Sequence, residues 1–374
     1  MAGVGRSILR ICLVSPARPP LWDYSNTSSE NRDAVLTTTD LRGFILLALG
    51  FYKLLDQTTG CAQRLELLVG WLTTSGRLRH LMAAIRAEPV NTLSTVASGV
   101  SSPTMSADGP KTLECRLPDE RTLTYTVAGE GAGPTVVANH GIPGSRLFAR
   151  LLDDAASNAG VRLLVPDRPG YGRSDAPPRD RGLMDWRNDY EALLAHESVE
   201  TATVLGFSGG GPFALAAATS DRTARIALVS ATIPGSGGAL TTLSRVPFLL
   251  RGFFRLGAWR ARWSGPEVVA DQLTDRDLSP ETAETVAADY HEALRQSAYA
   301  PVRELRSSAT TQTFDLSDTE LRVWHGTADE NAPLDPVRNL VTEVGGECTS
   351  VDADHLGTLL ECRRDAIAWL SQES

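Results

Sequence analysis

The residue best placed for chemistry in this sequence is Ser208, in the stretch Gly206-Phe207-Ser208-Gly209-Gly210. The strand-forming run 201–205 precedes this stretch, and the helix-forming run 213–218 follows it. A strand that turns directly into a helix strains the residue at the turn, so its close neighbours must lack a Cβ atom. The pattern predicts a serine hydroxyl that projects from a sheet edge beside the positive end of a helix, ready to act as a nucleophile. A tight structural turn with a solvated serine is the alternative.

A serine nucleophile needs a base to take its proton and a carboxylate to orient that base. His355 follows the last expected strand, on the loop before the expected final helix, and Asp329 follows the expected strand 321–325. Because the carboxyl ends of parallel strands meet at one edge of a sheet, we expect both side chains to reach Ser208. The order serine, aspartate, histidine is also the chain order of one known class of hydrolases.

Other acids and histidines are weaker candidates for these two roles. Glu330 is the alternative acid, whereas the segment after the preceding strand, 231–235, offers no acid. Asp352 and Asp354 beside the histidine are expected to be solvated loop carboxylates, and His325 is expected to pack or cap at the end of its strand. The remaining histidines are assigned to the surface, to a helix end or to the loop described next: His80, His291, His196 and His140.

The oxyanion that forms when a serine attacks a carbonyl needs backbone N–H donors. Gly209, at the start of the helix, is the first expected donor. The second is expected from the loop 140–145, which follows the strand 135–138 and contains Gly141 and Pro143. Gly141 permits close approach, and the N–H of Ile142 is the candidate. A purely structural turn is the alternative for this loop.

The elements that must position these residues alternate between strand and helix from residue 111 onward. Strands are expected at 112–117, 121–127, 135–138, 161–166, 201–205, 225–230, 321–325 and 347–351, the first two as a hairpin. Helices are expected after Ser208 and at 146–156, 186–196, 336–344 and 358–370. This alternation predicts a parallel sheet with helices on both faces.

The alternation stops between residues 233 and 318. Residues 240–263 and 280–307 are expected to be helical throughout and carry several aromatic side chains. A helical insertion near the carboxyl edge of the sheet is expected to act as a lid over the substrate. Extra core packing is the alternative.

Residues 1–104 differ from the rest of the chain. We expect a poorly ordered or helical extension, with plausible helices at 41–56, 62–73 and 77–87 followed by a Ser/Thr/Gly/Pro-rich linker. A small helical bundle or a winged or helix-turn-helix module is the alternative, although no recognition-helix signature is visible. The domain pattern begins soon after Met105, so we hypothesise that the native protein starts at or near Met105 and that the preceding residues are an over-extended reading frame. The intact mass of the native protein tests this hypothesis.

The bulk properties narrow the expected partners and compartment. The net charge of −9 argues against nucleic acid and anionic membrane surfaces as partners. No apolar run approaches the roughly 20 residues of a membrane span. The five cysteines are widely spaced and lack a Cys-x-x-Cys pair, which argues against a disulfide framework or a zinc site and favours a reducing, cytoplasmic setting.

Taken together in this order, several motifs resemble the α/β-hydrolase superfamily, in its lid-bearing group, over residues 110–372. The motifs are His140-Gly141-Ile142-Pro143-Gly144, Asp167-Arg168-Pro169-Gly170-Tyr171-Gly172-Arg173-Ser174-Asp175, Gly206-Phe207-Ser208-Gly209-Gly210, His325-Gly326-Thr327-Ala328-Asp329 and Asp354-His355. The resemblance implies an eight-stranded, mostly parallel sheet, a helical lid between strands six and seven, and a Ser208/Asp329/His355 triad. It assigns the loop 167–175 to shaping the sheet edge and assigns it no catalysis.

The resemblance also implies a reaction. Epoxide hydrolases and haloalkane dehalogenases carry aspartate at the nucleophile position, whereas this chain carries Ser208. The implied mechanism is two-step acyl transfer through an acyl-enzyme, without metal or organic cofactor, on a small or medium apolar ester, lactone or related carbonyl compound. The alternatives are an acyltransferase or cofactor-free perhydrolase, an aminopeptidase, and a non-catalytic ligand-binding protein on the same fold. A small molecule is the expected partner, and no pattern indicates an oligomeric state.

Overall fold

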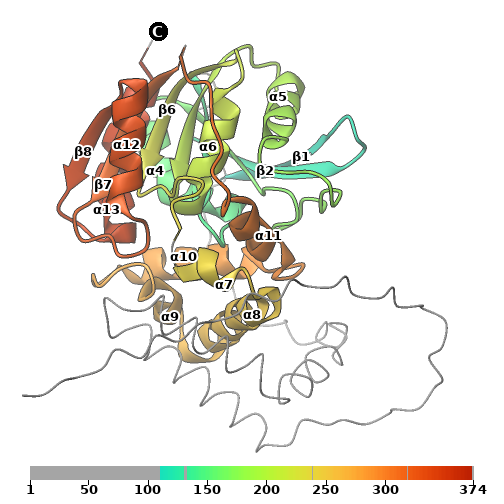
Figure 1. Cartoon of the computed structure of the whole chain (residues 1–374), viewed down its shortest axis with the longest axis vertical. Helices are drawn as coiled ribbons and strands as arrows, with labels where there is room; N and C mark the ends of the chain where they lie inside the picture. The colour runs from blue at the N-terminus through green and yellow to red at the C-terminus, as the bar shows by residue number, and fades with distance from the viewer. Residues whose placement is uncertain (1–109, 130–132, 238, 318, 373–374) are drawn as a thin grey trace, which may run out of the picture. The chain divides into compact units, whose positions relative to one another are not determined.

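The computed structural model describes residues 110–129, 133–237, 239–317 and 319–372, and within these ranges eight strands form one sheet (Figure 1). The strands lie in the order β1-β2-β4-β3-β5-β6-β7-β8. Their bounds are β1 (Lys111–Arg116), β2 (Thr122–Gly129), β3 (Thr135–Asn139), β4 (Arg162–Pro166), β5 (Ala202–Phe207), β6 (Thr223–Val229), β7 (Glu320–Gly326) and β8 (Glu347–Val351). Strand β2 runs antiparallel to β1 and β4, and all other neighbours are parallel. The predicted fold class and the predicted hairpin are therefore confirmed.

Helices cover both faces of this sheet because the central strands bury both of their faces. Every residue of β3 and β5 is buried, as expected of parallel strands between two helical layers. One core packs the sheet against α4 (Ala149–Asn158) and α13 (His355–Leu370). The other core packs it against α5 (Trp186–His196), α6 (Gly211–Ala218) and α12 (Leu334–Val344). This double layer fixes the carboxyl ends of the strands, where the candidate site lies.

The insertion between β6 and β7 forms five helices that lie together beyond one edge of the sheet (Figure 1). They are α7 (Ala239–Leu243), α8 (Pro247–Ser264), α9 (Glu267–Ala270), α10 (Pro280–Ala293) and α11 (Tyr299–Ser307). The prediction of unbroken helix over 240–263 and 280–307 is wrong. Pro247 disfavours helical backbone at the residue before it, which separates α7 from α8. The non-helical segment 294–298 separates α10 from α11. In this segment the Gln296 amide donates to backbone carbonyls of the 167–175 loop, at Gly172 and Ser174.

The extension 1–104, its three expected helices and the hypothesis of a start at Met105 lie outside the described residues. Among the described helices, none is long and apolar enough to cross a bilayer.

Candidate active site

Ser208 sits where β5 turns into a short 3-10 turn, η2 (Ser208–Gly210), that leads directly into α6. Its φ angle is +53°, in the left-handed region that a residue with a side chain rarely adopts. The turn also packs closely on the end of β3, because a Cβ atom at Gly210 would overlap the carbonyl oxygen of Asn139. The strained turn predicted from the glycine spacing is therefore present, and it presents the serine hydroxyl at the sheet edge.

The structure brings Ser208, His355 and Asp329 into one hydrogen-bonded chain. The Ser208 Oγ lies 2.8 Å from His355 Nε2, and the His355 Nδ1 lies 2.8 Å from Asp329 Oδ2 and 3.0 Å from Oδ1. Since a carboxylate only accepts, Nδ1 carries the imidazole proton and Nε2 is left to accept from the serine hydroxyl. This is the arrangement in which a histidine acts as general base toward a serine.

Asp329 is held in its ionised form. Its Oδ1 atom accepts hydrogen bonds from the backbone N–H groups of Asn331 and Ala332, at 2.9 Å each. Burial alone would raise the pKa of the Asp329 carboxyl, but the hydrogen bonds that it accepts from His355 and from the Ala332 N–H outweigh burial, so the pKa lies below its ordinary value. The alternative acid, Glu330, is exposed.

His355 is the first residue of α13, so the prediction that it lies on a loop before a helix starting at residue 358 is wrong. The helix starts earlier because Asp354 is its N-cap and accepts from the Gly357 N–H at 2.8 Å. Asp354 also accepts from the Thr274 hydroxyl at 2.7 Å, so it is not the solvated carboxylate that was expected. The cap fixes the orientation of His355 within the first helical turn.

Two further residues support the positions of Asp329 and His355. His325 is fully buried, and its Nε2 lies 3.0 Å from the Ala332 carbonyl, which secures the turn that carries Asp329. Its expected role in packing at the end of its strand agrees with this position. The ring of Phe207 packs against the His355 imidazole at a centroid distance of 5.2 Å and stacks on Phe148. Phe207 therefore forms an apolar wall beside the base.

The predicted oxyanion donors are also neighbours. A Cβ atom at Gly209 would lie 2.5 Å from Ile142 Cγ1, and one at Gly141 would lie 3.4 Å from the Ser208 Cβ. Within the described part of the chain, the Ile142 N–H donates no hydrogen bond. The Gly209 N–H lies in the first turn before α6, where backbone donors have no intrahelical partner. The two expected donors thus border the serine.

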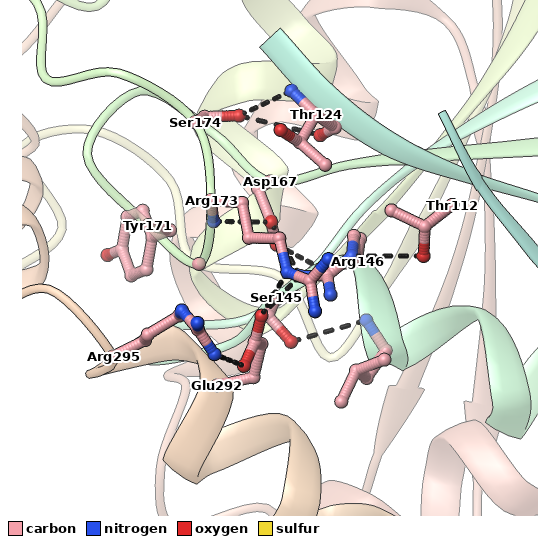
Figure 2. Close-up of polar contacts among 12 residues, drawn as sticks. Thr112, Thr124, Ser145, Arg146, Asp167, Tyr171, Arg173, Ser174, Glu292 and Arg295 are labelled. Carbon is pink, nitrogen blue, oxygen red and sulfur yellow. Dashed lines mark hydrogen bonds and ion pairs between the residues drawn. The ribbon is translucent and has the colours of Figure 1, made fainter. Parts of the chain in front are cut away.

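Sequence reasoning missed the acidic side chains that attach the insertion to the sheet edge. Asp289 and Glu292 of α10 bind Ser145 and Arg146, which follow β3. Figure 2 shows Arg146 between Asp167 and Glu292, with Nη1 2.8 Å from the aspartate and 2.6 Å from the glutamate. The arginines of the 167–175 motif were the available signal, but their acidic partners lie in the insertion, where no motif marks them.

In the described ranges, no group of three or more His, Cys, Asp or Glu side chains is arranged to hold a metal ion.

The fold agrees with the comparison with known families. A family model described as the alpha/beta hydrolase fold matches residues 134–325, more than half of the 374 residues. The chain belongs to the α/β-hydrolase fold family.

Individual relatives are more distant. The chain is 32% identical over 143 residues to the magnesium-chelatase 30 kDa subunit of Rhodobacter capsulatus, covering 36% of this chain and 50% of that protein. It is 36% identical over 99 residues to an epoxide hydrolase of Caballeronia sordidicola, covering 26% and 30%. The chain thus spans half or less of the length of these curated relatives. An esterase structure from Rhodococcus sp. ECU1013 superposes with a TM-score of 0.50 at 25% identity, covering 69% of this chain and 99% of that one.

Proposed function

We propose that this protein is a serine hydrolase that works through an acyl-enzyme on Ser208. The observation that carries the proposal is the continuous chain of hydrogen bonds from the Ser208 hydroxyl through His355 to Asp329, at 2.8 Å for each link. A solvated structural serine does not require a buried imidazole with its second nitrogen bound to an ionised carboxylate. The strained backbone at Ser208 favours the same role.

The reaction follows from this geometry. His355 Nε2 takes the hydroxyl proton as Ser208 Oγ attacks the substrate carbonyl, and the Asp329 carboxylate stabilises the imidazolium that forms. The carbonyl oxygen becomes an oxyanion, which accepts hydrogen bonds from the N–H groups of Ile142 and Gly209. The imidazolium then gives its proton to the leaving alcohol. Water repeats the same steps with the same base and releases the acid.

The surroundings favour a small or medium apolar ester, lactone or related carbonyl compound. Phe207 and Ile142 present apolar surface on two sides of the serine. The helical insertion, residues 233–318, acts as a lid over this site in the proposal, since its acids bind Ser145 and Arg146 after β3 and Arg168 after β4. The similarity to an esterase structure at 25% identity supports the ester class.

Acyl transfer and perhydrolysis would use the same acyl-enzyme with another nucleophile in the second step. An aminopeptidase would need a free acid to bind the substrate amine. Glu304, a buried acid of the insertion, already binds Arg168 and the Tyr171 hydroxyl and is not available for that role.

A panel of p-nitrophenyl esters of graded chain length, with lactones and aminoacyl amides beside them, tests the proposal. We expect hydrolysis of short or medium esters by the wild type and none above background by Ser208→Ala. Equal hydrolysis by the two proteins would contradict the role of Ser208. Turnover of amides alone would contradict the ester class and favour the aminopeptidase.

A further inference from the structure

Arg168 is a fully buried cation beside the proposed oxyanion site. Its side chain has 0% exposure, and its guanidinium lies over the Phe213 ring at 4.4 Å from the centroid. A buried charge is costly unless it is paired and hydrogen-bonded. The groups that Arg168 binds therefore indicate its structural role.

On one side, Arg168 donates to two backbone carbonyls of the loop after β3. Its Nη1 lies 2.5 Å from the His140 oxygen, and its Nη2 lies 3.1 Å from the Gly141 oxygen. The His140 Nδ1 also lies 2.8 Å from the Gly141 oxygen. Because Arg168 has five donors and no acceptor in a planar fork, it fixes the direction of both carbonyls.

The Gly141 carbonyl belongs to the same peptide plane as the Ile142 N–H. In a trans peptide these two groups point in opposite directions, so fixing the oxygen fixes the direction of the N–H. Donors on the carbonyl also polarise the peptide and strengthen its N–H as a donor. Arg168 and His140 thus bind the carbonyl oxygen of the peptide whose N–H, at Ile142, is the proposed oxyanion donor.

On the other side, Arg168 is held by the insertion. The Glu304 carboxylate of α11 binds its Nε at 2.9 Å and its Nη2 at 2.8 Å, and the Tyr171 hydroxyl donates to the same carboxylate at 2.8 Å. The charge of Glu304 outweighs burial, which would lower the pKa of Arg168, and so the pKa of the guanidinium is raised. Glu304 and Arg168 lie 136 residues apart in the chain, on the insertion and on the loop after β4.

We propose that Arg168 is a positioning residue that aims the Gly141–Ile142 peptide at the oxyanion, and that Glu304 holds Arg168 in place only while the insertion is seated. The site then stabilises the oxyanion fully only when the insertion covers it. This inference rests on the proposed function, because it assigns a role to the Ile142 N–H of the same site.

The test removes the ion pair without leaving a buried charge, in the double variant Arg168→Met/Glu304→Leu. Replacing both partners by apolar residues of similar size keeps such a core folded. The matched control is Arg121→Met/Asp189→Leu, a buried pair bound at 3.1 and 2.6 Å whose other bonds run to Asp119 and Arg181 rather than to residues 140–145. The single variant Glu304→Gln tests the insertion's part alone.

The substrate is p-nitrophenyl butyrate, and the transition-state probe is an n-alkyl trifluoromethyl ketone, whose serine adduct places an oxyanion in the site. We expect the Arg168/Glu304 double variant to lose about 10- to 100-fold in kcat, with KM changed by less than about threefold, and to bind the ketone weaker by a similar factor. Glu304→Gln should show a smaller loss of the same kind. The control pair should change thermal stability without these effects.

Equal kcat and ketone affinity in the two double variants would overturn the inference, as would a loss confined to KM. If the wild type itself neither hydrolyses the ester nor binds the ketone, the proposed function fails rather than the role of Arg168. Circular dichroism and the thermal midpoint identify any variant that does not fold. If the Arg168/Glu304 double variant does not fold, Glu304→Gln is compared with the wild type in its place.

Discussion

Replacing Asp329 by asparagine tests the base most sharply, because the structure dictates how the new amide must lie. Its Oδ1 atom accepts from the N–H groups of Asn331 and Ala332 and lies 3.0 Å from His355 Nδ1, while Oδ2 lies closer to Nδ1, at 2.8 Å. The asparagine oxygen will therefore take the Oδ1 position, and its NH₂ group will face the imidazole. An NH₂ donor at Nδ1 places the imidazole proton on Nε2, where it blocks acceptance of the Ser208 proton.

Rotating the asparagine amide by 180° would not restore the wild-type hydrogen bonds. It would set an NH₂ group against two backbone N–H donors and leave both unsatisfied, at roughly 1–3 kcal/mol each. The orientation that sets the amide oxygen at the closer Oδ2 position is then populated below roughly one part in thirty. The asparagine therefore retains at most the longer contact from the Oδ1 position to Nδ1. Loss of the negative charge beside the imidazolium adds to this, and the full loss is expected to be about 10³–10⁴-fold.

Steady-state kinetics with a p-nitrophenyl ester measures this effect, with thermal unfolding as the check on folding. Glu330→Gln is the matched control, since Glu330 is the neighbouring exposed acid, and it should retain the wild-type kcat. The reasoning is refuted if folded Asp329→Asn keeps kcat within tenfold of the wild type, or if Glu330→Gln causes the larger loss.

Three further predictions concern the same region. His355→Ala should lower kcat by about 10³-fold or more without unfolding the protein, and full activity in this variant would exclude it as the base. Burial raises the pKa of Asp289 to about 7, so the neutral carboxyl stabilises the fold at low pH, and this stability should be lost as pH rises from about 4 to about 7. Asp289→Asn should flatten that part of the plot of unfolding free energy against pH, measured by denaturant titration. A plot unchanged from that of the wild type would contradict the prediction. Gly210→Ala should cost about 3 kcal/mol of unfolding free energy, because its Cβ would overlap the Asn139 carbonyl, and a wild-type midpoint would show that the turn can shift.

The sheet was predictable from the sequence because its signals are local. The apolar run 161–166 is followed by a loop that begins with Asp167, and the run 201–205 is followed by a turn that begins with Gly206. Because the strands are parallel, their carboxyl ends lie at the same edge of the sheet. The same parallel order predicts that Ser208, Asp329 and His355 lie at one edge, although Asp329 follows Ser208 by 121 positions in the chain.

What could not be predicted depends on contacts between distant side chains. Nothing in the residues around Glu304 marks it as the partner of Arg168, and the role of that arginine appears only when the insertion and the loop after β3 are seen together. The early start of α13 was missed for a more local reason. Asp354 was interpreted as a solvated carboxylate, whereas it accepts from Gly357 and so caps the helix that begins at His355.

The central claim is that Ser208 forms a covalent bond to the acyl group, and mass spectrometry of the protein after reaction with an alkyl fluorophosphonate tests it most directly. We expect one adduct per chain, mapped to the peptide that contains Ser208. Labelling should be slowed by an excess of an ester that the protein hydrolyses, and it should be absent in Ser208→Ala. An adduct on another residue, or no adduct on folded wild-type protein that turns the ester over, would contradict the account.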